Sequence, residues 1–98
     1  MVLTTTDSIE GFKIVEYKGI VTGVAMNEEK LAMGFSISKY YKAIQESIDK
    51  VKEQAFQTLQ DNAQKLKANA VVGIKVEIEL TTSNYAMVSV TGTAVLVA

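Results

Sequence analysis

The chain has few residue types that could do chemistry, and one candidate pair is a serine placed three positions before a lysine. Ser36 and Lys39 match the S-x-x-K spacing, in which a lysine serves as the base for a serine nucleophile. The S-D-N and K-T-G elements that accompany this spacing in penicillin-recognising enzymes are missing, and Ser47 with Lys50 repeats the match by chance. We therefore interpret Ser36 or Ser38 as the cap of a following helix, a common role of serine.

Two carboxylates, Glu77 and Glu79, are a second candidate because they alternate with apolar residues. On a strand, this spacing places both side chains on one face about 7 Å apart, where they could hold a hard cation or act as acid and base. A solvated polar face is the commoner role of such alternation, and we prefer it. The hydroxyls of residues 4–6 and Ser8 have no adjacent histidine to activate them, so we expect them to serve strand and turn structure.

Metal ligands are the third class considered. Soft and borderline metal ions prefer thiolate or imidazole, and the chain contains neither Cys nor His. Thioethers remain at Met1, Met26, Met33 and Met87, but these positions are scattered, which favours packing. Without His or Cys, acid–base catalysis near neutral pH would need a carboxylate or lysine with a strongly shifted pKa. We therefore expect no enzymatic activity, no cofactor and no metal site.

Charge and hydropathy exclude further classes of partner. Lysines number ten, acidic residues number eleven, and arginine is absent. Because Arg is the residue best suited to bidentate phosphate and base-edge contacts, nucleic acid is not an expected partner. The N-terminus lacks the basic and apolar regions of an export signal, and no apolar run approaches about 18 residues. We expect no membrane association and a cytoplasmic location.

The elements that must position these residues follow from hydrophobic periodicity. Apolar residues at steps of three and four predict one long amphipathic helix from Ser38 to Lys67. Its apolar stripe consists of Tyr41, Ile44, Ile48, Val51, Ala55, Leu59, Ala63 and Leu66. A chain of 98 residues is long enough for one hydrophobic core, so we expect a single domain over residues 1–98.

Strands are predicted on both sides of the helix, at Val2–Thr5, Lys13–Met26, Val72–Leu80 and Tyr85–Val97. Gly19 and Gly23 predict a bend or bulge in the second strand, and residues 81–84 predict a hairpin. The last strand is apolar on both faces and needs cover on both. The predicted fold is α+β, an antiparallel sheet of about four strands packed on one helix in the order β-β-α-β-β. The apolar segment Leu31 to Phe35 belongs either to the core or to a contact with another subunit.

Several groups of residues are specific in combination. They are Thr4-Thr5-Thr6 with Ile9 and Gly11, Glu16 to Val21 with Gly23 and Ala25, Asn69 to Gly73, and Gly92 to Val95. Together with the helix spacing they resemble the YbjQ-like family of bacterial and archaeal domains, whose label refers to heavy-metal binding. Two features depart from the family. Lys67 stands where a glycine usually ends the helix, which suggests that Asn69 or a modified C-cap ends it here, and Asn27 to Ala43 is shorter than the usual connection.

The resemblance implies a homopentamer in which extra strand pairing between subunits closes a ring. The residues themselves indicate only that one helix on a four-stranded sheet leaves apolar area for a neighbour to bury. We therefore predict a non-enzymatic, self-assembling homopentamer that presents a repeated surface to a small ligand or a protein, with no biochemical activity assigned. The alternative is an ion- or metabolite-binding module with sites at subunit junctions or on the ring axis.

Overall fold

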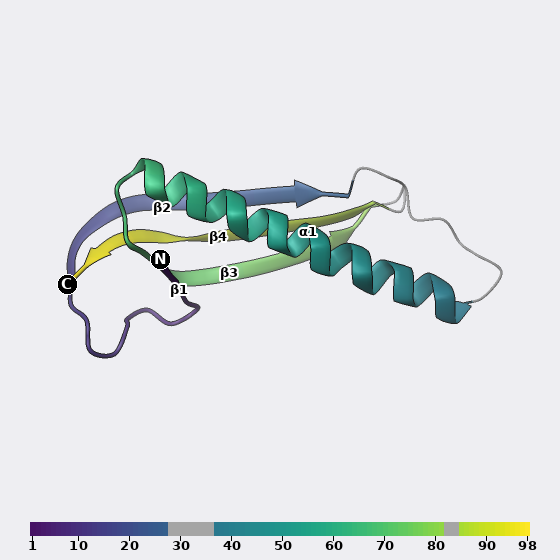
Figure 1. Cartoon of the computed structure of the whole chain (residues 1–98), viewed down its shortest axis with the longest axis horizontal. Helices are drawn as coiled ribbons and strands as arrows, with labels where there is room; N and C mark the ends of the chain where they lie inside the picture. The colour runs from purple at the N-terminus through teal and green to yellow at the C-terminus, as the bar shows by residue number, and fades with distance from the viewer. Residues whose placement is uncertain (28–36, 82–84) are drawn as a thin grey trace.

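The computed structural model of the chain describes residues 1–27, 37–81 and 85–98. Its elements are β1 (Val2–Leu3), β2 (Ile14–Met26), α1 (Ile37–Lys65), β3 (Ala70–Leu80) and β4 (Ala86–Val97). Figure 1 shows α1 crossing one face of the sheet diagonally. The predicted helix and strands are confirmed in kind and order, and their ends differ by at most two residues. In the described part of the chain, no helix combines the length and apolar character needed to span a membrane.

The four strands form one mixed sheet in the order β1-β3-β4-β2. The prediction of antiparallel pairing is confirmed where β4 pairs with β2 and with β3. It is corrected at β1, which runs parallel to β3 through Val2↔Ala70 and Leu3↔Val71. The physical reason is that residues 4–13 carry the chain from one edge of the sheet to the other. β1 and β2 therefore lie on opposite edges and do not form a hairpin.

Three glycines have distinct structural roles in the sheet. Gly19 (φ 127°) and Gly73 (φ 62°) lie at register shifts, where the extra residue of a bulge requires a backbone conformation that glycine adopts readily. The predicted bulge at Gly19 is confirmed. Gly23 instead keeps regular pairing with Val90. Its role is to admit the helix, because an added Cβ would lie 2.0 Å from the carbonyl oxygen of Ala55.

The main core lies between α1 and the sheet. Four residues of the predicted stripe are buried there, namely Val51, Ala55, Leu59 and Ala63. They pack against Val21 of β2 and the inward residues Val88, Val90 and Ala94 of β4. A second cluster on the other face contains Val72, Val95 and Val97, covered by Ile9 and Ile14. At this end the chain itself supplies the cover that the two-sided apolar strand needs.

The helix ends through a Schellman motif centred on a lysine. The amide of Lys67 donates to Gln64 O at 2.9 Å, and the amide of Ala68 donates to Ala63 O at 3.1 Å. Lys67 itself has φ 63°, the left-handed conformation usually supplied by glycine. The predicted modified C-cap is therefore confirmed. Asn69 does not cap the helix but extends the pairing of β3 with β4. Its Nδ2 donates to Val97 O at 2.9 Å, and its Oδ1 accepts from Val97 N at 2.8 Å.

Candidate functional site

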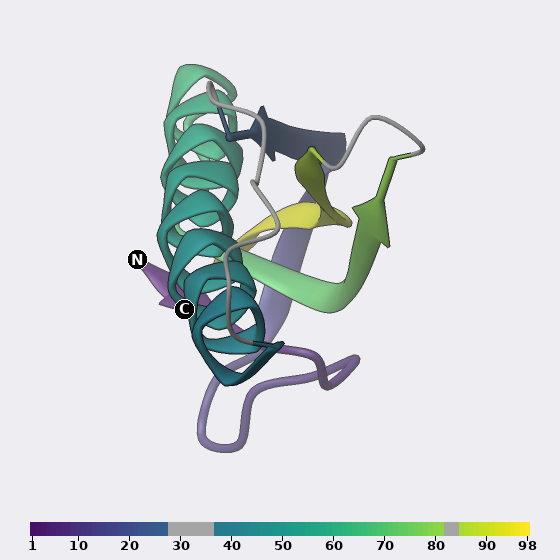
Figure 2. The same ribbon diagram turned by 90° about the vertical axis from the view of Figure 1, so that its right-hand side faces the viewer.

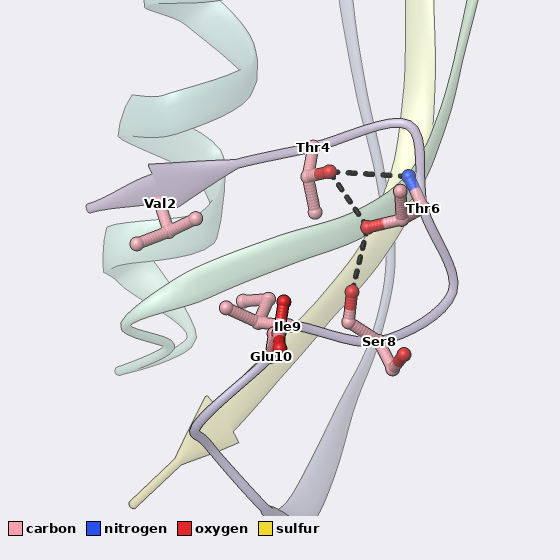
Figure 3. A pocket seen from close by; sticks show the side chains of 6 residues that line it. All are labelled: Val2, Thr4, Thr6, Ser8, Ile9 and Glu10. Carbon is pink, nitrogen blue, oxygen red and sulfur yellow. Dashed lines mark hydrogen bonds between the residues drawn. The ribbon is translucent and has the colours of Figure 1, made fainter.

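The hydroxyl-rich N-terminal segment lines an open hollow with Val2, Thr4, Thr6, Ser8, Ile9 and Glu10 (Figure 3). Thr6 Oγ1 donates to Ser8 O at 2.6 Å, which uses its hydroxyl hydrogen. The 2.8 Å contact between Thr4 Oγ1 and Thr6 Oγ1 must then use the hydrogen of Thr4. Thr4 Oγ1 also accepts from the amide of Thr6 at 3.1 Å. Both hydroxyl hydrogens are thus engaged by neighbouring atoms, which agrees with a role in turn structure.

The same segment holds the N-terminus on the bulged part of β3. The amide of Gly73 donates to Thr6 O at 2.8 Å, and the amide of Ile74 donates to Thr4 O at 3.1 Å. These bonds satisfy the backbone where the bulge interrupts regular pairing with β4. Of the residues that line the hollow, only Glu10 is charged. The threonines therefore stabilise the sheet edge, and the hollow offers no activated nucleophile.

The S-x-x-K pair is not assembled into a site by the described residues. Ser36 lies outside them, so its capping role stays a prediction. Ser38 and Lys39 are exposed in the first turn of α1, and Ser38 therefore lies inside the helix and is not its cap. Ser47 and Lys50 lie further along the same helix. The S-D-N and K-T-G motifs that would complete a catalytic site are missing from the sequence.

Glu77 and Glu79 lie on the sheet face away from α1, paired in register with Ser89 and Met87. Both carboxylates belong to exposed residues, which fits the predicted solvated face. Over the described ranges, His, Cys, Asp and Glu form no group of three or more that could hold a metal ion. Among the described residues, no third carboxylate joins Glu77 and Glu79.

Two of the four methionines are brought together by the fold, although the sequence suggested scattered positions. Met26 of β2 and Met87 of β4 are register partners on the sheet face away from α1. Sequence reasoning missed this pair because the register between strands far apart in the chain is not visible from periodicity. Adjacent thioethers beside apolar residues are typical of adaptable packing surfaces. Met33 and the apolar segment Leu31 to Phe35 lie outside the described residues.

The feature with most functional content is an uncovered apolar surface on the helix side of the sheet. Val76, Ile78 and Leu80 of β3 share this face with buried Val90, Val88 and Ala86 of β4, their register partners. They nevertheless remain 40%, 47% and 52% exposed. Ile37 and Tyr41 in the first turns of α1 are 74% and 64% exposed. We call these five residues the open apolar surface.

This surface exists because the apolar stripe of α1 is longer than its contact with the sheet. The stripe continues towards the start of α1 at steps of three and four. Ile48 and Ile44 are half-buried there, and Ile37 and Tyr41 are exposed. The first fourteen residues of α1 (37–50) extend about 21 Å at 1.5 Å per residue. Figure 1 shows this part leading beyond the ends of the strands, and Figure 2 shows the last part of β3 bending away from α1. The predicted stripe is thus fully buried only over its second half.

Two strand edges are also open in the described part of the chain. β2 pairs with β4 on one side and has no described strand on the other. β3 is bordered by β1 and the threonine segment only as far as Ile74, so residues 75–80 form a second free edge. Free edges carry unpaired N–H and C=O groups that a strand of another chain can bond. One subunit therefore presents two free edges among its described strands.

The dimensions of the chain also indicate missing contacts. Its radius of gyration is 16.1 Å, compared with about 13 Å for a compact domain of this length. Its accessible surface is 6649 Å², which exceeds the roughly 5,500 Å² of a compact monomer of this mass by about 1,100 Å². Each partner in a stable interface buries about 800 Å². The excess belongs to the chain as a whole and does not locate an interface on it.

Comparison with known proteins identifies the family of this chain. The model of the YbjQ family, described as "Putative heavy-metal-binding", matches residues 1–98. The chain belongs to this family. A UPF0145 protein of Clostridium kluyveri is 36% identical over 105 residues and one of Acetivibrio thermocellus is 30% identical over 105, with 99% of each chain covered in both comparisons. A solved structure from Pediococcus pentosaceus, of a protein of unknown function in the DUF74 family, aligns with 100% of this chain and 98% of its own chain. The TM-score is 0.73 and the sequence identity is 22%, which shows a shared fold.

The description of the YbjQ family names heavy metals, and the donor set of this member can be compared with it. Zinc and similar ions are held by thiolate, imidazole or clustered carboxylates. This chain has no Cys and no His, and its described carboxylates do not cluster. The residues present in one subunit therefore do not fit a zinc-type site.

Proposed function

We propose that this YbjQ-family chain is a non-enzymatic, self-assembling protein that forms a closed homopentameric ring. The single observation that carries the proposal is the open apolar surface, because a stripe that continues at helical spacing beyond its own sheet needs another partner. The ring presents repeated copies of one surface to a small ligand or a protein. The number five rests on the family resemblance alone.

The open edges allow a contact between different surfaces of two copies. A free edge on β2 and another on β3 are different surfaces, so a contact between them is heterologous. Heterologous contacts build either rings or filaments, and a ring leaves no edge exposed for aggregation. Closure would bury in every subunit the edges and the apolar residues that one chain leaves open.

The absence of enzymatic activity is proposed from the side-chain inventory. General acid–base catalysis near neutral pH depends most often on His, and nucleophilic catalysis on Ser, Cys or Thr beside a base. The chain has no His or Cys, and the hydroxyl hydrogens of Thr4 and Thr6 are engaged within their own turn. These observations support a binding or structural role over catalysis.

The second candidate function is an ion- or metabolite-binding module with sites at subunit junctions or on the ring axis. Glu77 and Glu79 favour it, because they are exposed on the part of β3 that has a free edge. Ring closure would repeat this carboxylate pair at every junction. Native mass spectrometry of the intact assembly separates the candidates, since a bound ion or metabolite adds mass to the bare polypeptide multiple.

Assembly is tested by size-exclusion chromatography with light scattering. The proposal expects a mass about five times the 10.7 kDa of one chain. It also expects the melting temperature to rise with protein concentration, because assembly stabilises the folded state by mass action. A monomeric mass at micromolar concentration contradicts self-assembly, and a closed ring of another size contradicts only the number taken from the family.

A further inference from the structure

We propose that Met26 and Met87 form a binding site for a soft monovalent metal ion of the Cu(I) type, with the carboxylate of Glu79 beside them. The site lies within one chain, so it does not depend on the self-assembly proposed above. The expectation of no metal site rested on the absence of Cys and His and on scattered methionines. The fold removes the second of these reasons, because it brings two methionines together.

The hydrogen bonds beside the two methionines show that they form a close pair. The amide of Asn27 donates to Ala86 O at 3.0 Å, so these two residues are a hydrogen-bonded pair of the β2–β4 ladder. In an antiparallel ladder such pairs alternate with non-hydrogen-bonded pairs, whose Cα atoms are only about 4.5 Å apart. Met26 and Met87 lie one position along each strand and are therefore a close pair of this second kind. Both side chains leave the sheet away from α1, since the neighbouring Val88 packs towards the helix.

Two thioethers at this separation can hold one ion. Metal–sulfur bonds are about 2.3 Å long, so two sulfur atoms bound to one ion lie no more than about 4.6 Å apart. Methionine is unbranched and has three rotatable bonds, which lets both sulfur atoms reach a common point above the sheet. Met26 is 45% exposed and Met87 is half-buried, so an ion can enter directly from solvent.

The charges on this face of the sheet favour a cation. Glu79 is the register partner of Met87 in β3, so one row across the sheet holds both thioethers and a carboxylate. The adjacent row on the same face consists of Val24, Ser89 and Glu77. Register partners are about 5.5 Å apart or less, so the charge of Glu79 acts within the screening length of about 8 Å. Lys75 of the same strand lies four residues from Glu79, about 13 Å away, and is largely screened.

The donor set selects a soft ion of low charge. Thioether sulfur is a soft and neutral ligand, and soft sulfur ligands select Cu(I). Ca²⁺ and Mg²⁺ require six or more oxygen ligands, and Zn²⁺ is held by thiolate, imidazole or several carboxylates. Two thioethers with one carboxylate meet neither requirement. Met1, the third methionine in the described part of the chain, precedes β1 at the opposite edge of the sheet and takes no part.

The test uses Ag(I) as the probe, because it is a soft monovalent ion that air does not oxidise. The full chain is labelled with ¹³C in the methyl groups of its four methionines and titrated with silver nitrate in chloride-free buffer. The methyl resonances of Met26 and Met87 should shift together and saturate at one Ag(I) per chain. Cu(I) added without oxygen should shift the same two resonances, and Zn²⁺ should shift neither.

Three variants assign the site. Met26→Leu and Met87→Leu keep an apolar side chain of similar volume without sulfur, so the fold should survive, as circular dichroism would verify. Each should weaken Ag(I) binding at least about tenfold, the lower end of the cost of disturbing a metal ligand. Glu79→Gln, at an exposed position, should weaken it by about two- to fivefold, as expected for an exposed charge pair, and less at high salt.

Met33→Leu is the matched control and should bind Ag(I) like the unsubstituted chain. If the methionine pair serves packing alone, Ag(I) shifts no methyl resonance at stoichiometric concentration, and the inference is overturned. It is also overturned if all four methionines respond equally, or if Met33→Leu weakens binding as much as Met26→Leu. Retained binding in both Met26→Leu and Met87→Leu would likewise refute it.

Discussion

Replacing Lys67 by glycine should stabilise the protein, although it removes a side chain and a charge. Lys67 occupies the left-handed position of the Schellman motif with φ 63°. For a residue with a Cβ, this conformation costs about 1–2 kcal/mol relative to the right-handed region, and glycine avoids that cost. Both hydrogen bonds of the motif come from the backbone amides of Lys67 and Ala68, so they survive the substitution.

The net effect is smaller than the strain that is relieved. Glycine increases the conformational entropy of the unfolded chain, which lowers stability by about 0.4–1 kcal/mol. The difference leaves about 1 kcal/mol in favour of Lys67→Gly. For a domain of this size, that amount raises the melting temperature by about 4–8 °C.

The matched control is Lys65→Gly, which makes the same change two residues earlier. Lys65 is the exposed last residue of α1, so glycine there should reduce stability by about 0.5–1 kcal/mol. Thermal and urea unfolding of both variants should be compared at one protein concentration, because assembly also contributes to stability. If Lys67→Gly proves no more stable than the unsubstituted chain, or matches Lys65→Gly, the strain at this cap has been misjudged.

Three further predictions test the core, the helix–sheet contact and the metal ligands. Val51→Asp should unfold or severely destabilise the domain, because it places an unpaired carboxylate at a position that is 2% exposed. Glu53→Ala, at an exposed position, should change stability by less than about 0.5 kcal/mol. Equal melting temperatures of the two variants would contradict the assignment of the buried face. Gly23→Ala should destabilise the fold by about 3 kcal/mol or more in urea unfolding, because the added Cβ would lie 2.0 Å from the carbonyl oxygen of Ala55. A loss of stability below about 1 kcal/mol would show that α1 can shift to make room. Calorimetric titration of tag-free protein with Zn²⁺, Cd²⁺ and Cu²⁺ should give only weak, non-stoichiometric heats, because the chain has no Cys or His, and a stoichiometric micromolar site would disprove this.

The candidate sites show where prediction from the sequence worked and where it could not. The structural role of the threonines was predictable, because a hydroxyl without a neighbouring base has little nucleophilic use. The pairing of Met26 with Met87 was not, because it depends on the register of two strands separated by sixty residues. Gly23 was predicted as a bend, yet its role is set by the approach of Ala55, which no local pattern reports.

Topology shows the same division. The ends of the helix and strands predicted from the sequence lie within two residues of the observed ends. This is possible because the direction of side chains along one helix or strand is a local property. The parallel pairing of β1 with β3 was missed, because a strand of two residues carries too little pattern to indicate its neighbour. Its position depends on the path of residues 4–13 around the sheet.

The sequence by itself determined that one face of α1 is apolar from Tyr41 onward, because the spacing of residues along a helix fixes which side chains share a face. Only the tertiary structure decided how much of that face one chain can cover. Coverage depends on where the helix crosses the sheet and on where β3 bends, and both are set by contacts between residues far apart in the chain. The sheet buries the stripe from Val51 to Ala63 and leaves Tyr41 exposed, so a pattern that predicts a core within one subunit also supplies a surface for a second.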